Sequence, residues 1–412
     1  MPKRFEVDGA RVLADLNALR AFGAYKTGVH RPTFSKEHMQ ALEWLMAAMP
    51  SAGLTPEIDG IGNVLGRSDR PGPRLLTGSH LESQNYAGWL DGPLGVIYAL
   101  EAARVLNASD LSGSVEVASW SDEEGHFGSL MGSRSYVGAV SDEEIDSAHD
   151  RTDGRAMRQA ITDAGLATHP RLLYEPGRHI GYLEAHIEQG DTLEAGNLKI
   201  GVVTSIVGIW QYEVTFTGAQ NHAGTTRMAV RRDAGLALAK FCIAIDEQFP
   251  KVCGPRTVWT TGRMTLDPGA PSIIPGEATM LFQVRDADPS VAERLESVLQ
   301  SLAADFARRG PCGVSVKRTR AGAPARMDAG IQDAIETACA EHAPDKSLRM
   351  PSGAGHDAQM LAKVMPAGML FVPSIGGISH HWTENTSDDD IVTGARVFVA
   401  ASANLLERAV RG

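Results

Sequence analysis

The chain has 412 residues, of which 43% are hydrophobic and 22% are charged, and its formal net charge is -11. This length favours two domains, and the ordinary composition excludes a disordered chain. No apolar run approaches the roughly 20 residues that span a membrane, and no basic cluster is present. We therefore expect neither a membrane nor a nucleic acid as partner.

Cysteine usage and the amino terminus both indicate a reducing compartment. The four cysteines lack Cys-x-x-Cys spacing and are interpreted as small buried apolar groups rather than as disulfides or metal ligands. The amino terminus has basic residues but no apolar signal core after them. We therefore expect a cytoplasmic protein.

The chain begins with alternating helical and strand patterns. Apolar residues recur at helical spacing from 35 to 49, where Ser35 can serve as the N-cap. Short apolar runs next to turn residues read as strands. In this part of the chain, the predicted helices are 7–22, 35–49 and 96–106, and the predicted strands are 60–65, 74–77 and 115–120. The alternation predicts an α/β fold.

A glycine-rich stretch after the strand at 74–77 carries an imidazole at His80 and a carboxylate at Asp91. Gly78 permits a sharp exit from the strand, and Gly92 lets the following helix pack closely. In an open α/β sheet, sites are built at this edge. The pair is typical of a metal site, although His80 alone could be a hydrogen-bonded buried histidine and Asp91 alone an N-cap.

Two adjacent glutamates, Glu123 and Glu124, follow the strand at 115–120. Side chains of neighbouring residues at a strand end point in different directions. One glutamate can therefore ligate a metal while the other faces the bound water, as metal-assisted hydrolysis requires. A solvated acidic turn is the alternative for such a pair taken alone.

Two further histidines stand in or after predicted strands. His186 lies in an apolar strand-like segment at 181–190, where a buried imidazole needs a partner. A buried strand at 369–372 leads through a glycine-rich turn to His380. The chain thus offers five candidate metal ligands, which are His80, Asp91, Glu124, His186 and His380.

These residues stand in motifs that resemble one known family, the hydantoinase/carbamoylase branch of the zinc-dependent M20 amidohydrolases. That branch includes N-carbamoyl-L-amino-acid hydrolases, allantoate amidohydrolases and β-ureidopropionases. The resemblance runs from about residue 34 to about residue 396. Its most specific motifs are Gly78-Ser79-His80, Asp91-Gly92, Glu123-Glu124-Gly125, His186-Ile187-Glu188-Gln189-Gly190, His222-Ala223-Gly224-Thr225-Thr226, Ile274-Pro275-Gly276-Glu277, Ser352-Gly353-Ala354-Gly355-His356-Asp357-Ala358 and Ser379-His380.

The resemblance implies two divalent metal ions per subunit, bridged by Asp91 and a water or hydroxide. His80 and His186 would complete the protein ligands of one ion, and Glu124 and His380 those of the other. Mixed imidazole and carboxylate ligation suits zinc, and manganese, cobalt or nickel could substitute.

The resemblance also implies roles for two acids near the ions. Glu123 would take a proton from the attacking water and hand it to the leaving nitrogen. The family usually has aspartate two residues after the first histidine, where it orients that imidazole, and here the residue is Glu82. A longer carboxylate makes the same hydrogen bond to His80 only with a different backbone or rotamer.

Several positions concern the substrate. Arg285 matches the family arginine that holds the substrate carboxylate, a role suited to its planar fork of donors. Ser272 stands where the family commonly has asparagine, and Arg227 stands where it has proline. The reaction type therefore carries over more directly than the substrate. Further substrate contacts implied by the resemblance are Gln189, His222 and His356.

Residues 208–327 read as a smaller domain inserted into a catalytic metal-binding domain made of residues 1–207 and 328–412. The predicted strands of the insert are 210–217, 256–266 and 278–285, and its predicted helices are 233–249 and 291–309. This pattern suggests an α+β lid. By resemblance, the lid pairs with its twin in a homodimer, and His222 reaches the substrate of the other subunit.

The sequence therefore predicts a metal-dependent hydrolase of a linear amide or ureido C–N bond in a small carboxylated substrate, first of all an N-carbamoyl-L-amino acid. Allantoate and other N-acyl amino acids are the alternative substrates. A non-catalytic relative that binds a small molecule or acts as a scaffolding dimer is the alternative class. Glu123 and all five candidate ligands are present, which argues against that class.

Overall fold

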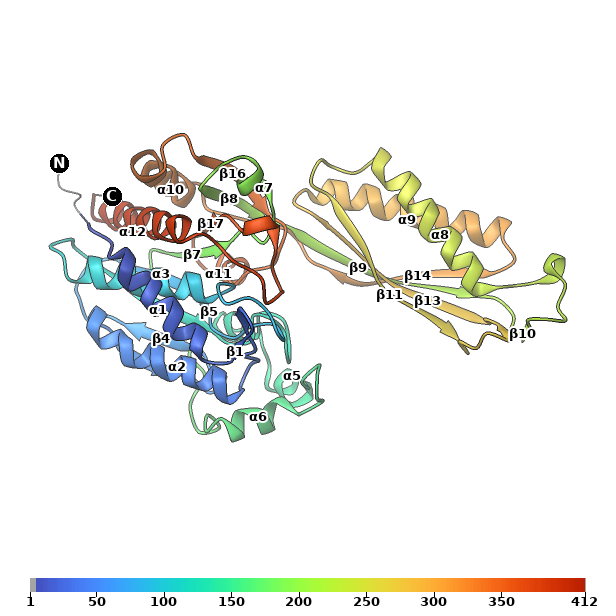
Figure 1. Ribbon diagram of the computed structural model, residues 1–412, viewed down its shortest axis with the longest axis horizontal. Coiled ribbons are helices and arrows are strands. Elements are labelled where there is room, and N and C mark those ends of the chain that lie inside the picture. The colour runs from blue at the N-terminus through green and yellow to red at the C-terminus, as the bar shows by residue number, and fades with distance from the viewer. Residues whose placement is uncertain (1–4, 412) are drawn as a thin grey trace. The chain divides into compact units, whose positions relative to one another are not determined.

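The computed structural model describes residues 5–411, and the chain divides into two compact units. The first unit is formed by the chain up to Thr204 and from Arg326 onward, and the second unit is Ser205–Ala325, drawn from green to orange in Figure 1. The insert expected from the sequence, 208–327, starts three residues later and ends two residues later than this unit. Between residues 5 and 411, no helix is long and apolar enough to cross a membrane.

A nine-stranded sheet forms the centre of the first unit. Its strands are β3 (Thr55–Ile58), β4 (Val64–Arg67), β5 (Arg74–His80), β6 (Ser114–Trp120), β7 (Gly181–Ile187), β8 (Ile200–Ile206), β15 (Ala325–Arg326), β16 (Ser347–Ser352) and β17 (Ala367–Val372). Their order is β15-β8-β17-β7-β5-β6-β4-β3, and β16 pairs with β8. The middle strands β17, β7, β5 and β6 run parallel. Because parallel strands end at one edge of a sheet, the carboxyl ends of these four strands meet there.

Long helices pack on this sheet and share a core with it. They are α1 (Gly9–Ala21), α2 (Lys36–Ala48), α3 (Pro93–Asn107), α10 (Ala329–His342) and α12 (Asp388–Arg411). The core contains Leu183, Ala185 and Ile187 of β7. Since side chains alternate along a strand, Glu184 and His186 point to the opposite face of the sheet.

Short elements complete the first unit. A hairpin of β1 (Ala24–Tyr25) and β2 (Gly28–Val29) precedes α2. The short helices are α4 (Met131–Tyr136), α5 (Asp142–Ser147), α6 (Met157–Asp163), α7 (Thr192–Ala195) and α11 (Ala358–Leu361). Of these, α4 contacts β6, and α11 contacts β7 and β17.

The second unit has two layers. Its sheet is antiparallel in the order β11-β13-β9-β14, with β9 (Gly208–Thr217), β11 (Val258–Asp267), β13 (Glu277–Asp286) and β14 (Gly313–Ala321). Helices α8 (Ala234–Gln248) and α9 (Pro289–Arg309) cover one face (Figure 1). Burial alternates along β9, where Tyr212, Val214 and Phe216 join the core under the helices. A two-stranded ladder of β10 (Asn221–His222) and β12 (Ile273–Ile274) lies apart from this sheet. The predicted α/β fold with a smaller inserted α+β unit is confirmed.

One predicted strand begins later in the structure, and one strand of the insert's four-stranded sheet was not predicted. The strand expected at 60–65 begins only at Val64, because the Asp59 carboxylate accepts the main-chain N–H groups of Ile61 and Asn63 and holds this segment in a turn. Strand β14 was not expected, because as an edge strand it lacks a row of fully buried side chains.

Candidate active site

The first group of possible metal ligands is His80, Asp91 and His186. One ligand atom of each residue lies within 4.8 Å of the others. His80 ends β5, His186 lies in β7, and Asp91 precedes α3, and all three are buried. Nε2 of His186 is 3.0 Å and Nε2 of His80 is 3.5 Å from Oδ1 of Asp91. Three separate segments thus bring their donor atoms to one point.

Gly92 gives His80 the room it needs. The φ of Gly92 is +87°, and a Cβ at this position would lie 2.5 Å from Nδ1 of His80. A side chain here would therefore displace the imidazole, and the left-handed backbone also favours glycine.

Main-chain contacts determine the tautomers of the two buried imidazoles. Nδ1 of His80 lies 3.1 Å from the main-chain oxygen of Glu82, and Nδ1 of His186 lies 2.9 Å from that of Ile187. A carbonyl oxygen only accepts, so each Nδ1 carries a hydrogen and each Nε2 can keep its lone pair. Both Nε2 atoms face Asp91, which is the arrangement that a metal ligand needs.

The second group, Asp91, Glu124 and His380, shares Asp91 with the first. Nε2 of His380 is 3.4 Å from Oδ2 of Asp91 and 3.6 Å from Oε2 of Glu124. The Gln84 side-chain amide donates to Oε2 of Glu124 at 2.6 Å, and the Gln84 main-chain N–H donates to Oε1 at 3.2 Å. The side chain of His380 is 51% exposed, so the second group is more open than the first.

The electrostatics of these groups fit a divalent cation. Burial raises the pKa of Glu124, and the charge of Asp91 raises it further. Burial also raises the pKa of Glu123 well above its usual range, although His80 opposes this. Nε2 of His80 has no hydrogen-bond partner among the described residues. Clustered buried carboxylates that face an unbonded imidazole nitrogen are the donor set that zinc and similar ions accept.

Glu123 lies beside the first ligand group, in the turn after β6. Its side chain is 11% exposed, and its Oε2 is 3.8 Å from Nε2 of His80. Its main-chain N–H donates to Oε1 of Glu82 at 2.6 Å. The same Oε1 is 3.8 Å from Nδ1 of His80, which is beyond hydrogen-bond distance. The Glu82 carboxylate therefore contacts the main chain of Glu123 rather than the imidazole.

Two of the expected substrate contacts lie next to the ligands. Gln189 donates from Nε2 to Oδ2 of Asp91 at 2.8 Å. The buried ring of His356 is 4.5 Å from the ring of His186. Burial, and then the charge of His186, lower the pKa of His356 well below its usual value. Burial thus favours the neutral form of the His356 imidazole, which can still form hydrogen bonds.

Glu384 is a site residue that the sequence analysis missed. Its buried carboxylate accepts the main-chain N–H groups of Leu90 at 3.3 Å and Asp91 at 3.1 Å, and the Ser379 hydroxyl lies 3.0 Å from it. Burial, and then the charge of Asp91, raise the pKa of Glu384 to about 8. Glu384 thus ties the Asp91 segment to the His380 loop. Its position four residues after His380 is the only signal for it in the sequence.

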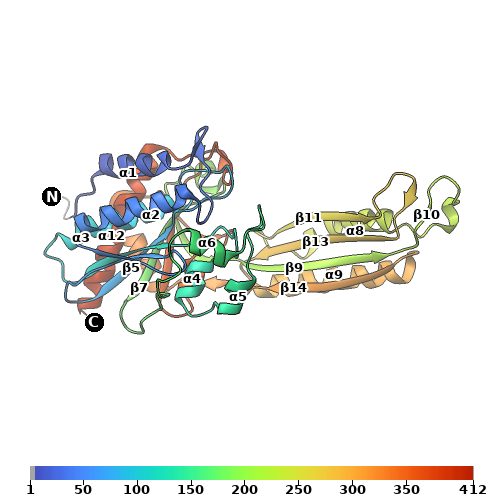
Figure 2. The same ribbon diagram turned by 90° about the horizontal axis from the view of Figure 1, so that it is seen from below.

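The expected substrate contacts of the second unit do not come together. His222 and Ser272 are neighbours, since the N–H of Ala223 donates to the oxygen of Ser272 at 2.9 Å. They lie beyond the carboxyl end of β9, where Figure 2 shows β10. Arg285 instead pairs with Ile209 at the amino end of β9. About eight residues of β9 separate these two places. At a rise of roughly 3.3 Å per residue, the distance between them is about 26 Å.

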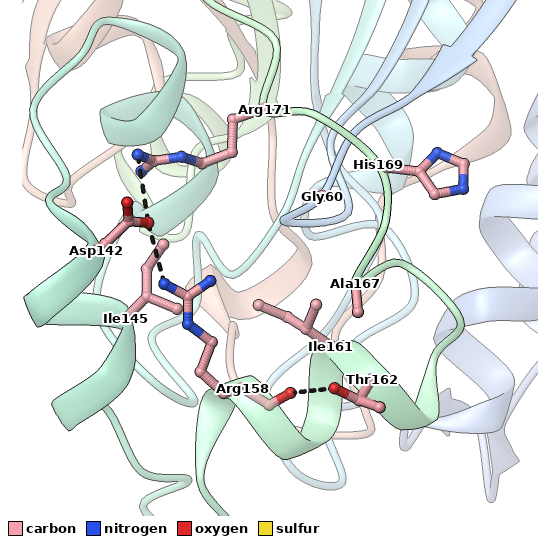
Figure 3. A pocket seen from close by; sticks show the side chains of 9 residues that line it. All are labelled: Gly60, Asp142, Ile145, Arg158, Ile161, Thr162, Ala167, His169 and Arg171. Carbon is pink, nitrogen blue, oxygen red and sulfur yellow. Dashed lines mark hydrogen bonds and ion pairs between the residues drawn. The ribbon is translucent and has the colours of Figure 1, made fainter.

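A separate cavity of about 400 Å³ lies in the first unit near α5 and α6 (Figure 3). Arg158 and Arg171 line it, and both point at Oδ1 of Asp142, at 3.0 and 3.6 Å. Arg158 also pairs with Asp146 at 2.5 Å. Because these arginines are already paired with carboxylates, and no candidate metal ligand lines the cavity, we assign it no part in the chemistry.

A mixed sheet whose parallel middle strands carry imidazole and carboxylate groups at one edge, together with an inserted α+β unit, points to the class of metal-dependent hydrolases. Residues 76–404 match the profile of Peptidase family M20/M25/M40. The chain belongs to this family, and the resemblance drawn from the sequence motifs is confirmed.

Individual relatives cover almost the whole chain. The N-carbamoyl-L-amino-acid amidohydrolase of Paenarthrobacter aurescens is 36% identical over 399 residues, which are 94% of this chain and 95% of the relative. The allantoate amidohydrolase of Escherichia coli K12 is 30% identical over 388 residues, 92% of this chain and 93% of the relative. A crystal structure of a hydantoinase/carbamoylase family amidase from Burkholderia phymatum matches with a TM-score of 0.90 at 44% identity, covering 98% of this chain and 99% of its own. This chain is likewise a hydrolase of carbon–nitrogen bonds.

Proposed function

We propose that this protein hydrolyses the ureido C–N bond of an N-carbamoyl-L-amino acid with two divalent metal ions. The observation that carries the proposal is the convergence of two ligand groups on Asp91, with Glu123 beside them. A relative that covers nearly the whole chain is named for N-carbamoyl-L-amino acids, which favours this substrate. Allantoate and N-acyl amino acids are the alternatives. The four cysteines are free, which supports a cytoplasmic location.

The five candidate ligands would hold the two ions. His80, Asp91 and His186 would bind one, and Asp91, Glu124 and His380 would bind the other. Zinc is the first choice for this donor set, and manganese, cobalt or nickel could substitute. When bound, such ions polarise the scissile carbonyl and make a water molecule more acidic.

Glu123 would carry the proton during hydrolysis. Its carboxylate accepts a proton from the water that attacks the carbonyl carbon. When the C–N bond breaks, its electron pair goes to the nitrogen, and Glu123 returns the proton there. Support comes from the position of its Oε2 near His80 and from burial, which raises the pKa of Glu123. A raised pKa makes a carboxyl a better proton carrier near neutral pH.

The remaining site residues would bind the substrate. Arg285 would hold the carboxylate through two parallel hydrogen bonds, while Gln189 and His356 would contact the substrate beside the ions. His222 and Ser272 lie beyond the far end of β9, which is about 26 Å from Arg285 by strand rise, so they cannot hold the same small molecule as Arg285 of that chain. This separation supports a homodimer in which the insert, as lid and dimerisation domain, supplies His222 to the other subunit.

The homodimer can be tested by complementation. Co-expressed Arg285→Ala and His222→Ala chains should form mixed dimers in which one of the two sites has both residues intact. With random pairing, the mixture should recover about a quarter of wild-type activity, as expected for twofold symmetric exchange. Light scattering should give a dimer at micromolar concentration. A monomer, or a mixture no more active than the single variants, would contradict this arrangement.

The function itself is tested by metal analysis together with a substrate panel. We expect two equivalents of divalent metal per chain, and faster hydrolysis of N-carbamoyl-L-amino acids than of allantoate or N-acetyl amino acids. Faster turnover of an alternative would reassign the substrate and keep the reaction. Absence of turnover across the whole panel in metal-loaded protein would instead favour a non-catalytic binding protein.

A further inference from the structure

The segment that follows β5 contacts both glutamates of the turn after β6. Gln84 holds the side chain of Glu124 through the hydrogen bonds given above. Glu82 acts differently, because its Oε1 accepts the main-chain N–H of Glu123 at 2.6 Å. Glu82 thus touches the backbone that carries the proposed proton carrier.

The side chain of Glu82 is fully buried, and its second oxygen faces a buried imidazole. Its Oε2 lies 3.6 Å from Nε2 of His38, which is also fully buried. Nδ1 of His38 accepts the N–H of Phe34 at 3.1 Å, so Nε2 carries the hydrogen and points at Glu82. The buried guanidinium of Arg31 supplies positive charge nearby, and its pKa is lowered to about 10 by burial, against the opposing charge of Glu82.

The turn that carries Glu123 needs such support. Asp122 has a φ of +58°, a left-handed conformation that is uncommon for a residue other than glycine. Its buried carboxylate accepts the N–H groups of His126 at 2.8 Å and Gly128 at 2.8 Å, which fixes the turn on its later side. The hydrogen bond from the main-chain N–H of Glu123 to Glu82 fixes the turn at Glu123, the proposed proton carrier. Without an acceptor at residue 82, a mostly buried N–H would lose its partner.

We propose that Glu82 is a positioning residue that fixes the main chain of Glu123 and thereby aims its carboxylate at the reacting atoms. The inference rests on the proposed function, because it concerns the same reaction. His80 does not need this carboxylate for its orientation, since its Nδ1 is held by the main-chain oxygen of residue 82. Any side chain at position 82 leaves that oxygen in place.

Two variants of similar size separate the roles of the hydrogen bond and the charge. Glu82→Gln keeps an acceptor oxygen for the N–H of Glu123 but removes the charge, and Glu82→Met removes both. We expect kcat of the glutamine variant to exceed that of the methionine variant by about 10-fold, because small misplacements of a catalytic group are costly. KM and bound metal should change little in either variant. Hydrogen exchange of residues 121–128 should increase in the methionine variant alone.

Other outcomes would overturn the proposal. Equal kcat in the two variants would show that the acceptor oxygen has no role. Equal loss of bound metal in both would show that the charge of Glu82 serves the metal ligands instead. If the methionine variant does not fold, the glutamine variant alone tests the proposal. In that case, a loss in kcat above about 10-fold with metal retained would overturn the inference. Glu123→Gln separates this from the proposed function, because near-normal turnover there removes Glu123 as the proton carrier whatever Glu82 does.

Discussion

Glu123→Gln is expected to lower turnover by roughly 10²-fold or more, the usual loss when a positioned acid or base is removed. The amide has nearly the size of the carboxylate, so packing beside His80 should be kept. The hydrogen bond to Glu82 should also remain, because it comes from the main-chain N–H of residue 123. Turnover measured on protein with verified metal content would therefore report the loss of proton transfer alone.

Glu124→Gln is the matched control for this experiment. It makes the same chemical change at the next residue, whose carboxylate lies 3.6 Å from Nε2 of His380 in the second ligand group. We expect this variant to bind less metal, and to lose activity for that reason. If Glu123→Gln also loses metal, Glu123 is a ligand. If it turns over nearly normally, another group carries the proton.

The two candidate ligand groups could be predicted from the sequence because their residues stand in or after recognisable strands. His80 and the Glu123–Glu124 pair follow apolar runs that had to be buried, and β5 and β6 prove to be parallel neighbours. The contact of Glu82 could not be predicted in this way. It joins residues 41 positions apart. It also depends on whether the carboxylate reaches the imidazole of His80 or the main-chain N–H of Glu123. Glu384 was missed because its partners are main-chain N–H groups of a distant segment.

In the insert too, the strands could be predicted from the sequence, but the way they pair could not. Strands β9 and β13 were predictable because every second side chain is buried against α8 and α9. The distance between His222 and Arg285 could not be predicted, because it depends on the pairing of β9 with β13. That register places Arg285 beside Ile209 and the carboxyl end of β9 beside Glu277. The proposed homodimer therefore gains an argument from strand register.

The structure also supports a role for Arg285 in anion binding. Arg285 is partly buried on β13, and its Nε donates to Oε1 of Gln283 at 2.8 Å. Burial, and then the charge of Arg320, lower the pKa of Arg285, although an arginine remains a cation at neutral pH. The partly buried guanidinium of Arg285 is repelled by the charge of the exposed Arg320, and a bound anion would offset that repulsion. A substrate carboxylate fits this requirement.

Arg285→Ala should then lower kcat/KM by roughly 30-fold to several thousand-fold. This range corresponds to a loss of about 2 to 5 kcal/mol when one partner of a desolvated charge pair is removed. Arg285→Lys should recover only part of the loss, because lysine keeps the charge but not the fork of donors. Arg320→Ala is the matched control, since Arg320 is exposed on β14, and it should cost less.

The decisive comparison pairs each N-carbamoyl amino acid with its carboxamide analogue. Wild type should prefer the carboxylate, because the bidentate pair with Arg285 exists only for that substrate. Arg285→Ala should lose most of this preference, since its effect on the uncharged analogue should be small. If wild type does not distinguish the two analogues, or if the variant weakens both equally, Arg285 does not hold the carboxylate. The assignment to N-carbamoyl amino acids would then lose its main support within the chain, while hydrolysis of a carbon–nitrogen bond would stand.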